Sequence, residues 1–110
     1  MIEVPLEIEE VSVAHDGSTI KTWTSNGLFS RRDGPARTII DRDGRVIYLE
    51  WCIDGKPHRL DGPAIIIDHS EVQMKEWWIG GENLTLEEYL SSVPEKNIAD
   101  IAYHFGEYSD

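Results

Sequence analysis

Residues 51–64 read W-C-I-D-G-K-P-H-R-L-D-G-P-A, and the same pattern has already occurred once earlier in the chain. Residues 23–36 read W-T-S-N-G-L-F-S-R-R-D-G-P-A, so tryptophan, Asx-Gly, arginine and Asp-Gly-Pro-Ala all recur at a spacing of 28 residues. A third copy begins at Trp77 as W-W-I-G-G but continues as N-L-T-L-E-E over 83–88. Self-similarity at a period of about 20 to 50 residues is typical of repeat proteins. We therefore expect a short repeat array that ends in a cap.

Each unit carries two turn signals, separated by apolar runs that are too short for helices. The Asx-Gly or Gly-Gly after the tryptophan predicts a tight hairpin in which Gly27, Gly55 and Gly81 take a positive φ. At the Asp-Gly-Pro turn, Gly34 and Gly62 are expected to adopt unusual backbone angles that a β-branched residue tolerates poorly. The proline that follows fixes φ where the next strand starts. Each unit is therefore predicted to be a β-hairpin repeat.

The large side chains that recur with the repeat are expected to be structural. Trp23, Trp51 and Trp77 fall at equivalent places on successive hairpins, where they could stack as a ladder. Arg31 and Arg59 also recur, so we expect each to lie across a tryptophan face or to bond a neighbouring turn rather than to serve an active site.

The pattern W-x-x-[ND]-G-x-x-x-R-x-D-G-P-A resembles the MORN-like repeat proteins, in the divergent short form of small phage and large-virus proteins. The resemblance covers roughly residues 14–90, with two full copies and two partial ones. Such repeats serve as scaffolds, so the resemblance implies a viral setting and a repeat sheet but no particular activity. The usual MORN unit is shorter and richer in tyrosine and glycine, so the membrane-lipid association attributed to that family is not expected here.

The segment before the first unit is predicted to be an edge strand. Residues 2–14 alternate apolar and acidic residues at a period of two, which predicts one buried and one exposed face. Pro5 favours a place at the edge of the sheet. The side chains expected on the buried face are Ile2, Val4, Leu6 and Ile8. Those expected on the other face are Glu3, Glu7 and Glu9.

The segment after the last unit is predicted to be a helical cap. Residues 85–88 form a capping box with Thr85 as the N-cap, and apolar residues follow at helical spacing over 86–93. Pro94 begins a second amphipathic helix, for which Gly106 is the expected stop. We expect both helices to lie on an exposed face or end of the sheet.

These features predict one domain over 1–110, of mainly β (α+β) class. Residues 1–82 are expected to form an antiparallel β-meander of about three hairpin repeats, with Gly80-Gly81 ending the sheet. Residues 83–106 are expected to form the cap of two short C-terminal helices. Cys52, the single cysteine, excludes an internal disulfide and is expected to be a buried, inert thiol in a reducing compartment.

The net charge of −11 is unevenly distributed. Residues 1–16 carry five acidic and no basic residues, residues 17–67 carry eight basic and six acidic, and residues 68–110 carry two basic and ten acidic. One interpretation is solubility; the other is a partner with a basic surface, reached by electrostatic steering. The proposed partner-binding carboxylates are Glu7, Glu9, Glu87, Glu88, Glu95 and Asp100. They would form one surface if the cap lay over the first strand.

The sequence offers little for catalysis or cofactors. The histidines, at 15, 58, 69 and 104, have no metal-ligand spacing, so no metal or cofactor is expected. Five arginines over residues 31–45 are interleaved with aspartates, so direct nucleic-acid binding is not expected. No apolar run approaches the ~20 residues of a membrane span and no signal peptide is evident, so we expect no membrane and a cytoplasmic place, in an infected host cell if the protein is phage-encoded.

Three functions follow in order of preference. The first is a non-enzymatic acidic binding protein, a phage-type inhibitor that blocks a basic, nucleic-acid-handling host defence protein. The alternative is a structural or oligomerisation module built on a flat tryptophan-bearing sheet, for instance a homodimer. The third is a small hydrolase that uses a histidine and a carboxylate in the last hairpin.

Overall fold

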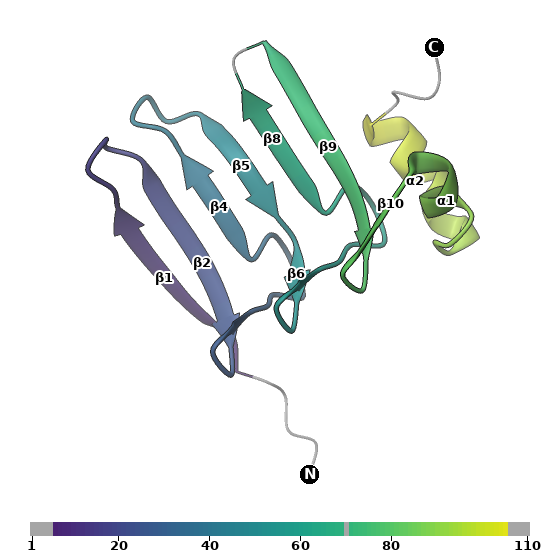
Figure 1. Ribbon diagram of the computed structural model, residues 1–110, viewed down its shortest axis with the longest axis horizontal. Helices are drawn as coiled ribbons and strands as arrows, with labels where there is room; N and C mark the ends of the chain where they lie inside the picture. The colour runs from purple at the N-terminus through teal and green to yellow at the C-terminus, as the bar shows by residue number, and fades with distance from the viewer. Residues whose placement is uncertain (1–5, 70, 106–110) are drawn as a thin grey trace.

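An open antiparallel sheet with two helices at one end makes up the computed structural model, which describes residues 6–69 and 71–105 (Figure 1). The strand order is β1-β2-β4-β5-β8-β9-β10, with β3 paired to β2, and β6 and β7 form a separate small ribbon. The strands are β1 (Ile8–Val13), β2 (Thr19–Ser25), β3 (Leu28–Phe29), β4 (Arg37–Ile40), β5 (Val46–Glu50), β6 (Cys52–Ile53), β7 (Lys56–Pro57), β8 (Ile65–His69), β9 (Val72–Ile79) and β10 (Glu82–Leu84). The helices are α1 (Leu86–Leu90) and α2 (Glu95–Phe105). The predicted capped meander is therefore confirmed.

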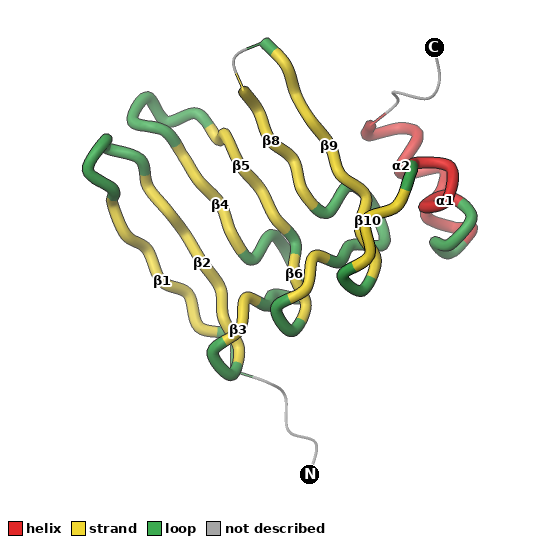
Figure 2. Tube along the Cα trace, in the orientation of Figure 1, coloured by secondary structure: helices red, strands yellow, loops and turns green. Residues whose placement is uncertain are grey.

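Short hairpins lie at one end of the strands in each unit, as Figure 2 shows along the lower side of the sheet. Their central residues both have positive φ: Asn26-Gly27 at 54° and 81°, Asp54-Gly55 at 51° and 81°, and Gly80-Gly81 at 58° and 86°. This is the two-residue turn that suits the twist of a hairpin, as the sequence predicts. The prediction that Gly80-Gly81 ends the sheet is wrong, because β10 follows this third turn and extends the sheet to Leu84.

The three tryptophans lie on one face of the sheet. In the antiparallel register, Lys21 lies opposite Thr38, and Thr38 lies opposite Leu49. Trp23 lies two residues after Lys21, and Trp51 lies two residues after Leu49, so both point to the same face as this row. The row continues through Ile66 to Lys75, because Ile66 pairs with Leu49 and with Lys75. Trp77 lies two residues after Lys75 and therefore points to that face as well.

The predicted ladder of stacked indoles is not formed: among residues 6–69 and 71–105, no ring contact joins two tryptophans. Successive tryptophans are separated by two strand spacings, which is about 10 Å and beyond ring contact.

The core lies at the helical end of the sheet. It consists of Trp77, Tyr89, Val93 and Ile101, with the Tyr89 ring centroid 4.9 Å from that of Trp77. Thr85 forms the predicted capping box, since its side chain accepts from the Glu88 backbone while the Glu88 side chain accepts from the Thr85 backbone. The helices therefore cover one end of the sheet, as expected.

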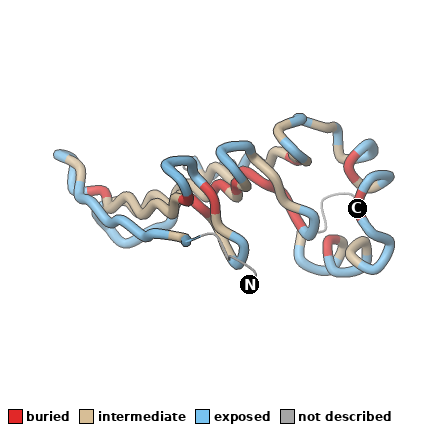
Figure 3. Tube along the Cα trace, turned by 90° about the horizontal axis from the view of Figure 1, so that it is seen from below, coloured by how far each residue is buried: buried red, intermediate tan, exposed pale blue. Residues whose placement is uncertain are grey.

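The rest of the sheet is a single layer, which Figure 3 shows edge on. All six residues of β1 are exposed, and Ile8, Val11 and Val13 keep 50%, 58% and 71% of their surface. Leu6 is also exposed. The predicted burial of Leu6 and Ile8 is wrong, because α1 and α2 pack at the opposite edge and the described residues form no second layer over β1 (Figure 1). The predictions for Ile2, Glu3, Val4, Pro5 and Gly106 fall outside the described residues.

Candidate functional site

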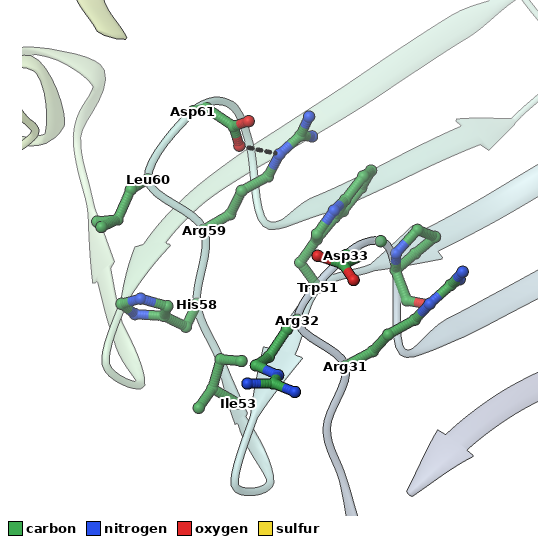
Figure 4. Close-up of a pocket in the computed structure, with 11 residues that line it drawn as sticks. Arg31, Arg32, Asp33, Trp51, Ile53, His58, Arg59, Leu60 and Asp61 are labelled. Atoms are coloured by element: carbon green, nitrogen blue, oxygen red, sulfur yellow. Dashed lines mark hydrogen bonds and ion pairs between the residues drawn. The ribbon is translucent and has the colours of Figure 1, made fainter. Parts of the chain in front are cut away.

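A groove lies between the two Asp-Gly-Pro loops, on the tryptophan-bearing side of the chain. Its cavity volume is about 730 Å³, and it is lined by residues 31–35, residues 58–61, Trp51 and Ile53. Figure 4 shows Trp51 between the loop that carries Arg31 and the loop that carries Arg59. The groove is the place where a cationic cluster and an indole meet, so it is the first candidate for ligand binding.

The backbone of each loop is fixed to the next unit. Arg31 N donates to Cys52 O at 3.0 Å, and Arg59 N donates to Trp78 O at 3.2 Å. These bonds link equivalent residues of successive units, so the groove walls are positioned by the repeat itself.

Side chains at one repeat position also bond to the next unit. Ser30 Oγ accepts from the Asp54 amide at 3.2 Å, and His58 Nδ1 accepts from the Gly80 amide at 2.9 Å. Ser30 and His58 occupy the same place in their units. His58 therefore accepts a backbone hydrogen bond where two units meet.

The two repeated arginines cover two of the tryptophans, as expected. The Arg31 guanidinium carbon lies 4.4 Å from the Trp23 ring centroid, and that of Arg59 lies 3.8 Å from the Trp51 ring centroid. Arg59 also donates to Asp61 at 2.9 Å, and its side chain is only 16% exposed. A guanidinium over an indole face is attracted by the ring quadrupole, so Arg59 is already engaged by Trp51 and Asp61.

Gly34 and Gly62 leave room for the guanidinium groups of Arg31 and Arg59, and the turn itself does not require glycine at these positions. Neither has a positive φ, so the predicted backbone requirement is wrong. A Cβ on Gly34 would lie 2.9 Å from the Arg31 guanidinium carbon, and one on Gly62 would lie 2.7 Å from that of Arg59. Glycine is therefore needed because a guanidinium packs against its α-carbon.

Tyr89 replaces the arginine in the third unit. Its ring packs on Trp77, while its hydroxyl lies 2.6 Å from Arg59 O and 2.8 Å from Gly62 O and accepts from Gly62 N at 3.2 Å. Burial raises the pKa of this phenol, so it stays protonated. Sequence reasoning placed Tyr89 on an apolar helix face but missed this hydrogen bonding, because the partners are distant in sequence.

A half-buried polar cluster on the opposite face was also missed. Arg37 pairs with Glu50 at 3.0 Å, and the Tyr48 hydroxyl donates to the same carboxylate at 2.9 Å. Burial, and then the bond to Glu50, raise the pKa of Tyr48 to about 12. Burial likewise raises the pKa of the Cys52 thiol to about 12, in keeping with the inert thiol expected. Arg37 does not recur, since Ile65 holds its place in the next unit, so the repeat gave no signal for the pair.

The six proposed partner-binding carboxylates do not form one surface. Glu7 and Glu9 lie at the β1 edge, whereas the other four lie on the helices or their first turns at the opposite edge (Figure 1). The condition for one surface, a cap that lies over the first strand, is therefore not met.

Two of the six already have partners. Glu7 accepts from Arg32 N at 2.8 Å, and Glu88 accepts from Thr85 N at 2.9 Å in the capping box. Reversing Glu88 would therefore disturb the helix start. Glu9, Glu87, Glu95 and Asp100 are exposed.

We also searched the described residues for metal-binding groups and membrane-spanning helices, and we compared the chain with known proteins. Among residues 6–69 and 71–105, no three histidine, cysteine, aspartate or glutamate side chains gather as a metal-binding group. No helix in that part of the chain has the length and apolar character to cross a membrane. Comparison with protein-family models, with curated proteins and with solved structures gave no match.

Proposed function

We propose that the chain is a non-enzymatic binding protein that recognises a basic surface of another protein. One observation carries the proposal: exposed carboxylates that form no ion pair with a described residue gather at both ends of the sheet. The ion pairs between described residues each use one arginine, namely Arg32, Arg37, Arg45 or Arg59. The exposed carboxylates at the ends of the sheet have no ion-pair partner within the same described residues. These are Glu9, Glu10, Glu87, Glu95 and Asp100.

Such a distribution suits a partner that carries clustered lysine and arginine. Exposed carboxylates steer a cationic protein during encounter, and they raise the association rate more than they slow dissociation. Proteins that bind nucleic acids present basic surfaces of this kind to phosphate. Occupation of that surface by an acidic protein would exclude the nucleic acid, which supports the role of an inhibitor, for instance of a host defence nuclease.

The test begins with affinity capture, which supplies a partner, and continues with association kinetics. Reversal of Glu87, Glu95 and Asp100 to lysine together with Glu9 and Glu10 is expected to slow association by about one to two decades. Added salt should slow the unaltered protein similarly, because it screens exposed charges. Arg42→Glu, in the middle of the sheet, is the control and should have little effect. Association that is indifferent to salt and to the reversals contradicts the proposal.

A homo-oligomerisation module is the second candidate. The observation that favours it is the exposed apolar surface of the single-layer sheet, where Val11, Val13, Val72 and Met74 are all exposed. An apolar interface between copies would persist at high salt, whereas a carboxylate interface would not. Light scattering at low and high salt decides: a constant dimer mass supports the module, and a monomer at both salt concentrations opposes it.

A further inference from the structure

The two edges of the sheet are protected to different degrees. The β10 edge has three residues and leads directly into the helices that pack on Trp77. The β1 edge has six residues, all exposed, and within the described part of the chain β1 pairs with β2 alone. Its register with β2 runs from Ile8 to Val13 without a bulge, and it contains no proline or glycine. A regular, exposed edge strand of this kind is a template for another strand.

The hydrogen bonds already made show which backbone groups face outward. Ala14 N donates to Ser18 O on the β2 side, whereas Trp23, opposite Glu9, donates its own N–H away from β1 to Ala36 O. Residues in an antiparallel ladder alternate between bonded and non-bonded pairs. The N–H and C=O groups of Glu9, Val11 and Val13 therefore point away from β2, into the space where a further strand would lie.

The side chains on this edge select among incoming strands. Glu9, Val11 and Val13 share one face, and Ile8 and Glu10 share the other. Adjacent carboxylates on both faces lie beside apolar positions, and β1 contains no basic residue. A second copy would bring two further carboxylates to the same short edge, where like charges oppose pairing. A cationic strand would instead be attracted.

We propose that β1 binds an extended basic segment of the partner by antiparallel strand addition, in a mode that rests on the proposed function. Read from its N-terminus, the segment has the pattern apolar-x-apolar-basic-basic. The apolar residues lie opposite Val13 and Val11, and the basic residues lie opposite Glu10 and Glu9. Backbone hydrogen bonds provide affinity, and the two faces of β1 provide specificity.

The first test uses a fluorescent peptide, S-V-T-V-K-K-S, and its acidic counterpart, S-V-T-V-E-E-S, with the full chain. The basic peptide should bind and the acidic one should not. Glu9→Lys combined with Glu10→Lys should invert that preference. Reversal of Glu87, Glu95 and Asp100 to lysine is the matched control and should leave the peptide preference unchanged. Equal binding of both peptides, or an inversion caused by the cap reversals instead, overturns the proposal.

The second test separates strand addition from charge attraction. Val11→Pro removes one outward N–H but no bond to β2, and proline is tolerated at such edge positions. Val11→Pro should weaken binding of the basic peptide about tenfold, because a hydrogen bond to the added strand is lost. Val11→Thr keeps the N–H and should bind normally, and unchanged thermal midpoints for both variants would show that the sheet is intact. If Val11→Pro binds as well as Val11→Thr, strand addition is wrong.

The proposed function can survive that failure. A partner whose association still depends on salt and on the carboxylate reversals, but not on Val11→Pro, recognises the acidic surface without adding a strand. A partner that is indifferent to all of these changes contradicts both proposals.

Discussion

At Trp51 an arginine from the same unit lies over the indole, whereas at Trp77 two aromatic side chains from the helices do so. Arg59 covers Trp51 beside an open groove, and it contacts the Phe105 ring at 5.5 Å as well. Tyr89 and Phe105 surround Trp77 at centroid distances of 4.9 and 6.2 Å. The same repeat position is thus covered by a largely buried cation beside a groove in one unit and by an apolar core in the next.

This difference indicates where the fold is stabilised. A cation over an aromatic ring contributes about 0.5–1 kcal/mol at an exposed site and more when desolvated. A fully buried aromatic residue contributes several times that amount, since its truncation costs about 3–5 kcal/mol. We therefore expect the capped end to dominate the free energy of unfolding, and the β1 end to be the first to open.

The largest effect is expected at Tyr89. Tyr89→Ala should lower the free energy of unfolding by about 4 kcal/mol, because it empties the core against Trp77. Tyr89→Phe keeps the ring and should cost about 1–3 kcal/mol, since the backbone groups of the Gly62 turn lose their partner. Urea unfolding followed by tryptophan fluorescence measures both, with exposed Tyr103→Ala as the neutral control. Equal losses for Ala and Phe would show that ring packing contributes little.

The next effect compares the two turn glycines. Gly62→Val should cost about 3 kcal/mol and Gly34→Val about 1 kcal/mol, both by overpacking. A Cβ on Gly62 meets Arg59 and also Phe105, at 2.8 Å, whereas one on Gly34 meets only the flexible end of Arg31. Thermal unfolding of both variants measures the difference. In the Arg31→Ala background, Gly34→Val should cost little further, and an undiminished cost there would restore a backbone explanation.

A smaller effect is expected for the arginines themselves. Arg59→Met should lower stability by about 1–2 kcal/mol and Arg31→Met by about 0.5–1 kcal/mol, since Arg59 is closer to its indole. Methionine preserves much of the side-chain volume, so the loss reports mainly on charge. Denaturant midpoints measure it, and a larger loss at Arg31 would contradict the ranking.

The smallest effect on stability is expected from Tyr48 and Cys52, on the face opposite the three tryptophans. It should be seen only at alkaline pH. Tyr48 and Cys52 have folded pKa values of about 12, above their ordinary values of 10.0 and 9.0. The unfolded chain therefore releases these protons first, so their contribution to stability is complete below about pH 9 and is lost as pH rises toward 12. The thermal midpoint of the unaltered protein should fall from pH 8 to 11, and the midpoint of Tyr48→Phe should fall less steeply. Parallel curves would exclude Tyr48 as a source of the alkaline loss.

The turns and the cap could be predicted because their signals are local. Asn26-Gly27 and Asp54-Gly55 favour left-handed backbone whatever surrounds them, and Thr85 with Glu88 forms a capping box within one turn. The role of Gly62 was misread because the atoms that exclude a Cβ come from Arg59 and from a distant helix.

The placement of surfaces was harder to predict. Alternation along β1 indicates which residues share a face, but it carries no information on whether a second layer covers Ile8. The separation of Glu9 from Glu87 depends on where the helices pack on the sheet. Neither the sequence of β1 nor that of the helices indicates this place by itself. Cross-strand clusters such as Arg37 with Glu50 need the register of the whole sheet.

The single-layer register also makes this molecule adjustable in length. Each unit of 28 residues inserts two main strands and is bonded to the next unit through repeated links, such as those from Arg31 to Cys52 and from Arg59 to Trp78. Duplication of one unit would therefore move the β1 edge about 10 Å further from the helices without rebuilding either end. Under the proposed function, the number of units would therefore set the distance between the two acidic ends that a partner contacts.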